Sequence, residues 1–292
     1  MTIQILANGI VAASTIALVA LGLSLIFRVT KVFHLAHALV ISATAYLAYF
    51  LTKQAGWPLF AALVVSLIFG TGLGALVELW IYRPLRSRSA TSLVCMVAAL
   101  GILIVGQNML SMLFGDQTKT LRSSHQQEVV QILGARLTEI QLLELGVATI
   151  VCCGVIYILR KSKFGKALRA IGSDWELSDA VGIPRNTVIL CVFVIASALA
   201  GLAGLLIAYD LDISPNAGFD VLLLALTAAI IGGIRTDWGP LLGAGLVGCI
   251  QHLSGWCWPT HWQNAIVYSS LIIFLLIRPQ GILGRPMTKV GN

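Results

Sequence analysis

The sequence predicts an all-α fold: a polytopic transmembrane bundle of about nine helices, within a range of eight to ten. Two observations support this prediction. Hydrophobic residues make up 58% of the 292 residues and charged residues only 11%, whereas a soluble domain has about 25% charged residues. Apolar runs long enough to cross a bilayer, which takes about 20 residues, follow one another along the chain. We therefore treat residues 1–292 as a single transmembrane domain.

The predicted crossings follow the apolar runs in order. The first run begins near the N-terminus without a preceding basic region, so we expect it to remain as a membrane helix rather than a cleaved signal peptide. The seventh and eighth runs are short and flanked by glycines, which favours half-helices or helices packed in the bundle interior. The nine runs are 5–27, 33–51, 57–82, 92–114, 140–159, 188–209, 219–234, 240–255 and 263–277.

The distribution of basic residues predicts the orientation. With the N-terminus outside and the C-terminus in the cytoplasm, only four of the 19 lysines and arginines fall on the outer side: Lys53, Lys119, Arg122 and Arg136. Cytoplasmic loops of membrane proteins carry an excess of Lys and Arg, and an odd number of crossings preserves this pattern. The net charge of +7 is thereby explained without a nucleic-acid partner.

The sequence contains no recognisable set of catalytic residues. A Gly-x-x-x-x-Gly-Lys-Ser/Thr phosphate loop and a His-Glu-x-x-His metal motif are both absent. His34 and His37 are three residues apart and would share a helix face. Satisfied polar contacts or a pore-lining role are favoured over a metal pair there, since no third ligand lies nearby. We expect a non-enzymatic chain that binds no metal and no cofactor of its own.

Acidic residues and glycines near the apolar runs are further candidates. Glu78 lies one turn from the inner end of its helix, where an ion pair with Arg83 is expected. Residues Asp210, Asp212 and Asp220 flank an outer connection, where carboxylates face a translocation mouth or act as solvated helix caps. For Asp220 the cap is favoured. A disulfide between Cys249 and Cys257 stays open. The glycine-rich runs, which include Gly232 and Gly233, favour close helix packing, or alternatively a path lined by backbone.

Two connections are too long to be turns: residues 115–139 outside and 160–186 inside. The sequence of the inner connection predicts a short amphipathic helix, with Lys166 and Arg169 on one face. Asp174 can cap a second short helical turn, and Gly182 suits a helix end. A basic amphipathic loop could equally anchor the chain to anionic lipids, so on its own it does not decide the function.

This inner connection resembles the coupling loop of ABC importer permeases. Glu176 and Gly182, six residues apart, are similar to the "EAA" pattern of those subunits, although Leu177 and Ser178 replace its usual alanines. The whole chain resembles the branched-chain amino acid permease family, with His34 and Ala38 departing from that family's usual Asn and Gly. The matching segments are 17–27, 33–37, 82–86, 214–215 with Gly218, 231–234 followed by 239–240, and 278–284.

The resemblance implies an ABC importer permease-like fold in the cell inner membrane, with contacts to cytoplasmic ATPases. The implied coupling residues are Gly165, Lys166, Arg169, Ala170, Glu176 and Gly182. For the translocation path the candidates are His34, His37, Gly232 and Gly233. An external solute-binding protein would dock on 115–139 and on Asp210, Asp212 and Pro215.

The resemblance also implies the remaining partners and the solute. Two ATPase subunits would hold ATP and Mg, and a second homologous permease would complete the membrane unit. The imported solute is small and polar, with branched-chain or related amino acids favoured. The alternative is an ion-coupled secondary transporter or channel acting without ATPases. That alternative usually needs paired acids in mid-membrane, whereas the acids noted above cluster near the membrane faces.

Overall fold

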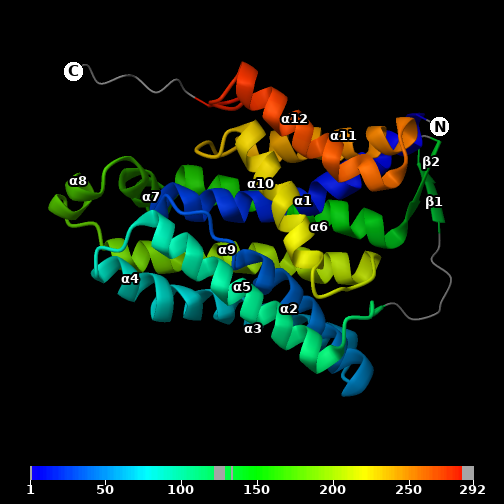
Figure 1. Cartoon of the computed structure of the whole chain (residues 1–292), viewed down its shortest axis with the longest axis horizontal. Coiled ribbons are helices and arrows are strands. Elements are labelled where there is room, and N and C mark those ends of the chain that lie inside the picture. Colours follow the sequence, from blue (N-terminus) through cyan, green and yellow to red (C-terminus); the bar gives the residue numbers. More distant parts are fainter. Residues whose placement is uncertain (1, 122–128, 133, 285–292) are drawn as a thin grey trace.

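The computed structural model describes residues 2–121, 129–132 and 134–284, and it forms an elongated helical bundle (Figure 1). The helices are α1 (Thr2–Thr30), α2 (His37–Tyr49), α3 (Leu59–Val77), α4 (Arg83–Ser87), α5 (Ser92–Phe114), α6 (Glu139–Lys161), α7 (Lys163–Ser173), α8 (Trp175–Ala180), α9 (Arg185–Asp210), α10 (Ala217–Gly232), α11 (Gly239–Cys257) and α12 (Gln263–Ile277). π-Helical turns Phe50–Gln54 and Glu78–Tyr82 extend α2 and α3, and a 3-10 turn, Thr260–Trp262, precedes α12.

The predicted crossings coincide with helices. Each of the nine apolar runs overlaps a helix, and within the described residues six segments are long and apolar enough to cross a membrane by length and composition. The helices α2, α10 and α11 fall outside that criterion; α10 has only 16 residues. The chain is therefore a multi-pass membrane protein.

Burial divides the bundle into a centre and a periphery. Helix α1 packs against α6, α9, α10 and α11, and 83% of its apolar window is buried, against 22% for α5. Helices α5 and α12 instead expose large apolar side chains, among them Met112 and Leu276. In a membrane protein such surfaces face lipid or another subunit.

Glycines allow α10 and α11 to touch. A Cβ at Gly243 would run into the Ala228 carbonyl, and one at Gly232 would run into the Gly239 carbonyl. Small residues let membrane helices approach closely, and the buried face of α10 supports the interior position expected for it.

A β-hairpin was not predicted. Strands β1 (Val129–Ile132) and β2 (Ala135–Thr138) pair antiparallel, from Val129 opposite Thr138 to Ile132 opposite Ala135. The hairpin lies beside the N-terminus, whereas α7 and α8 lie at the opposite end of the bundle (Figure 1). We call these the hairpin end and the α7–α8 end. Arg122 lies outside the described residues.

The partner expected for Glu78 was wrong. Its carboxylate pairs with Arg86, one turn further along α4, rather than with Arg83. Glu78 is buried and Arg86 nearly so. Arg86 lies eight residues after Glu78, about two turns along a helix, so the arginine nearest in the sequence is not the partner. The six cysteines are free, so no disulfide joins Cys249 to Cys257.

Candidate functional site

The connection between α6 and α9 forms two short helices, as predicted. Ser162 caps α7 by accepting a hydrogen bond from the Gly165 N–H at 3.1 Å. Asp174 caps α8 in the same way, from the Leu177 N–H at 3.1 Å. Gly182 ends this segment in the left-handed region, with φ of 81°. The amphipathic interpretation of the loop is thereby confirmed.

Helix α7 presents different faces to the bundle and to the outside. Leu168 and Ile171 are fully buried, whereas Lys166 and Arg169 are exposed. Of the remaining predicted coupling residues, Gly165 is buried, Ala170 is half-buried, and Glu176 and Gly182 are exposed. The structure thus places most of the predicted set on one accessible segment at the α7–α8 end.

Polar contacts fix α7 to the transmembrane helices. The Arg169 guanidinium donates to the Leu159 carbonyl of α6 at 2.7 Å. The Lys31 ammonium donates to the Gly172 carbonyl of α7 at 2.6 Å and to the Arg28 carbonyl of α1 at 3.0 Å. Burial, together with the charges of Arg235 and Arg28, lowers the pKa of Lys31 to about 8. Helix α7 is therefore linked by hydrogen bonds to the ends of α1 and α6.

A carboxylate that the sequence did not single out links the ends of α1 and α6. Asp237, in the α10–α11 connection, accepts from Arg28 at 2.7 Å and from Arg160 at 3.4 Å. Burial acts to raise the pKa of Asp237, but the hydrogen bond and charge of Arg28, with Arg160, hold it below its usual value. Arg160 also lies 5.7 Å from the Trp238 ring centroid. In the sequence, Asp237 is distinguished only as the single acid of the α10–α11 connection.

The last helix of the segment exposes an apolar surface. Leu177 and Val181 are 64% and 73% exposed, and Trp175 stacks against Arg185 with its guanidinium 4.2 Å from the ring centroid. We call Trp175, Leu177 and Val181 the α8 patch. An apolar patch rimmed by charges is typical of a protein contact surface.

The two histidines predicted for the path lie in an aromatic cluster. His34 Nδ1 and the Tyr82 hydroxyl are 2.8 Å apart, and the ring of His34 contacts Phe193 and His37. Both histidines are buried. Among the described residues no group of three His, Cys, Asp or Glu side chains could hold a metal. The Tyr82 contact satisfies one ring nitrogen of His34, whereas within the described residues Nε2 of His34 and both ring nitrogens of His37 are buried without a hydrogen-bond partner. The path assignment of both residues stays a prediction.

The two path glycines lie at the α7–α8 end. Gly233 adopts a φ of 107° between α10 and α11. The segment after α12 pairs with them, since the Ile282 N–H donates to the Ile231 carbonyl at 2.8 Å and the Leu283 N–H to the Gly232 carbonyl at 3.1 Å. These glycines allow close packing here; their part in a path stays a prediction.

At the hairpin end, the two connections predicted to receive a partner meet. Lys119 and Ile213 exchange backbone hydrogen bonds of 2.9 and 2.7 Å. Asp212 is exposed and Pro215 is buried. Asp210 ends α9. The docking role of these residues stays a prediction, but the bridge joins the segments that carry them.

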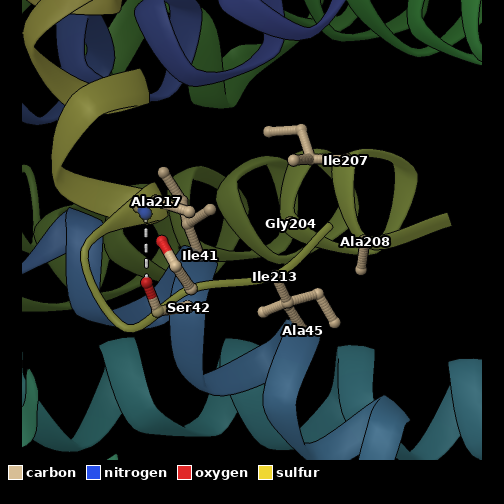
Figure 2. A pocket seen from close by; sticks show the side chains of 10 residues that line it. Ile41, Ser42, Ala45, Gly204, Ile207, Ala208, Ile213 and Ala217 are labelled. Carbon is tan, nitrogen blue, oxygen red and sulfur yellow. Dashed lines mark hydrogen bonds between the residues drawn. The ribbon is translucent and has the colours of Figure 1, made fainter. Parts of the chain in front are cut away.

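A serine from α2 caps the start of α10. The Ser42 hydroxyl accepts from the Gly218 N–H at 3.1 Å (Figure 2) and donates to the Pro215 carbonyl at 3.2 Å. Together with neighbouring apolar residues it lines a pocket of about 10 Å³, roughly the room for one water. Asp220 lies in the first turn, as expected, but no capping hydrogen bond is made by it in the described part of the chain.

A second buried acid was also missed. Glu144 of α6 is 3% exposed and accepts a hydrogen bond from the Ser14 hydroxyl of α1 at 3.4 Å. It is a carboxyl group within an otherwise apolar run, which is the pattern that marks a functional or tightly satisfied residue in a membrane helix. It lies near the hairpin end, about one turn inside α6.

The long apolar helices, the close glycine contacts and the short helix pair at one end define a multi-pass helical membrane protein. Solved structures agree on the fold. A chain of the PsaBC complex of Streptococcus pneumoniae bound to a Fab gives a TM-score of 0.53 at 16% identity, covering 95% of this chain and 93% of that one. A chain of a metal-chelate type ABC transporter in an inward-facing conformation gives 0.53 at 19%, covering 94% and 86%.

Sequence comparison then identifies the family. The sequence model of the branched-chain amino acid transport system permease component matches residues 5–276. Relatives include the high-affinity branched-chain amino acid permease proteins LivH of Escherichia coli K12 and BraD of Pseudomonas aeruginosa, each 30% identical over 97% of this chain and 96% of its own length. The chain belongs to this permease family. It is a transport subunit by family, as predicted.

Proposed function

We propose that this chain is a membrane subunit of an ATP-driven importer for branched-chain or related amino acids. The observation that carries the proposal is the anchored α7–α8 segment, which exposes Glu176 and the α8 patch while it is tied to α1 and α6. A cytoplasmic ATPase that drives transport needs a binding surface that is attached to the membrane helices, and this segment provides one. The family membership and the printed roles of the relatives support the solute class.

The proposed partners follow from this arrangement. Two cytoplasmic ATPase subunits, which hold ATP and Mg, bind the α7–α8 end, and this chain holds no nucleotide. A second homologous permease covers the exposed apolar face of α5. An external solute-binding protein docks at the hairpin end, where the Lys119–Ile213 bridge joins the two receiving segments. The N-terminus then lies outside the inner membrane and residue 284 on the cytoplasmic side.

The proposed mechanism uses the Asp237 contacts to carry motion inward. When the ATPases close on ATP, they move α7, and Lys31 and Arg169 transmit this movement to α1 and α6. Asp237 joins those two helices to the α10–α11 connection through Arg28 and Arg160. ATP therefore shifts the helix packing through differential binding of the two arrangements.

Purification and reconstitution test the proposal. The tagged chain is purified gently from its host, the accompanying proteins are identified by mass spectrometry, and the complex is placed in liposomes. We expect two ATPase subunits, a homologous permease, and leucine uptake that requires ATP and the binding protein. A chain that purifies alone and moves solute down an ion gradient without ATP would establish the secondary-transporter alternative.

A further inference from the structure

A groove lies between α5 and the start of α10. Its volume is about 530 Å³, within the range of about 300–1,000 Å³ found for small-molecule sites. It lies near the hairpin end: Gln107 is seven residues before the last residue of α5, about 10 Å along a helix axis, and Asp220 is in the first turn of α10. The lining residues are Leu100, Leu103, Ile104, Gln107, Asn216, Phe219 and Asp220.

The lining combines an apolar wall with three polar groups. Leu100, Leu103, Ile104 and Phe219 supply the apolar side, and polar groups come from both helices. Asp220 is exposed on the surface of this chain. A carboxylate turned toward lipid is costly, so acids in membrane helices face a water-filled path or another protein group. Asp220 lies in the first turn of α10 and its side chain is exposed, so the carboxylate is open to water or to an incoming group.

The Asp220 carboxylate is not used by the fold. The nearby Gly218 N–H donates to Ser42, a residue of another helix, at 3.1 Å. Within residues 2–121, 129–132 and 134–284, no hydrogen bond or ion pair holds Asp220. The missing partner is consistent with a cationic ligand.

We propose that this groove is a transient binding site for the translocated amino acid, with Asp220 receiving its α-ammonium group. The amide N–H groups of Gln107 and Asn216 then donate to the solute carboxylate, and the branched side chain contacts the apolar wall. An amino acid offers the three complementary groups that this lining requires. The proposal rests on the proposed function, and the second permease closes the open side of the groove.

Uptake of radiolabelled L-leucine by the full complex in liposomes, with binding protein outside and ATP inside, tests the site. For Asp220→Asn we expect uptake to fall about tenfold or more, the effect of losing one charge-assisted contact, while subunit assembly and binding-protein-stimulated ATP hydrolysis persist. Asp220→Glu keeps the charge and restores most uptake. Gln107→Leu lowers uptake by a few fold.

The neighbouring carboxamide Asn108 supplies a matched control. It is exposed and donates to the Ile104 carbonyl of its own helix at 2.7 Å, outside the groove lining, so Asn108→Leu is expected to transport like the unmodified chain. Wild-type uptake with equal uptake by Asp220→Asn and Gln107→Leu would overturn the site alone. A wild-type complex that hydrolyses ATP but takes up no leucine would overturn the solute class and the site together. Equal loss in Gln107→Leu and Asn108→Leu would assign the effect to α5 packing and overturn the site.

Discussion

The two ends of the molecule are built differently. At the α7–α8 end, side chains join separate helices: Lys31 and Arg169 bind carbonyls of α7 and α6, and Asp237 bridges Arg28 and Arg160. At the hairpin end, the connections are joined by a backbone bridge and by Ser42. In the proposed mechanism the first arrangement transmits movement between helices, whereas the second leaves side chains such as Asp212 and Asp220 exposed.

Removing the buried cation at the α7–α8 end should have the largest effect. Arg28→Ala leaves Asp237 with only the longer contact to Arg160. Because Asp237 is half-buried, the expected cost lies below the about 3–5 kcal/mol of a fully buried ion pair. We expect a much lower thermal midpoint in detergent and loss of uptake. Fluorescence-monitored thermal unfolding measures the first. A midpoint equal to that of the unmodified chain would show that the Asp237 contacts do not hold the helices together.

Low pH should weaken the Asp237 contacts at the α7–α8 end. The folded pKa of Asp237 lies below its unfolded value, which is about 3.9. Its stabilisation is therefore complete above that value and is lost as the pH falls through the lowered folded pKa. Asp237→Asn should remove this part of the pH dependence. Equal acid profiles of unfolding for the variant and the unmodified chain would exclude the contribution.

A polar change on the α8 patch should weaken ATPase binding without destabilising the bundle. Leu177 is 64% exposed, so Leu177→Asp should change the free energy of unfolding by no more than about 0.5 kcal/mol. We expect affinity for the ATPase subunits to fall about tenfold, as for a contact worth more than 1 kcal/mol. Co-purification yield and binding titration measure this. Lys163→Ala, an exposed change on α7, serves as the control; equal affinities for both variants would exclude the patch.

The smallest effect is expected at the hairpin end. Ser42→Ala removes the cap of α10, which costs about 1 kcal/mol. The α7–α8 contacts should be untouched, so uptake per ATP hydrolysed should stay unchanged while thermal stability falls slightly. Thermal unfolding and a coupled transport assay give both values. Uncoupling in Ser42→Ala would show that the two ends are not as independent as their contacts suggest.

The helices and the coupling segment could be predicted from local patterns. Apolar run length fixed the crossings, and Asp174 with Gly182 marked the ends of α8. Contacts between distant segments could not be read this way. Asp237 becomes important only because α1 and α6 end beside it, and Ser42 caps a helix 176 residues away. The Glu78 partner is Arg86, eight residues away, rather than the nearer Arg83. The hairpin forms by pairing between two strands, which residue periodicity does not reveal.

The central claim is that α7 and α8 carry ATP-driven motion into the membrane helices. The most direct test is the ratio of leucine uptake to ATP hydrolysis for Arg169→Glu and Glu176→Lys in the reconstituted complex. The account predicts that ATP hydrolysis continues in assembled complexes while uptake is lost, because the contact between the ATPase subunits and the α7–α8 segment is broken. Full coupled uptake in both variants would contradict it.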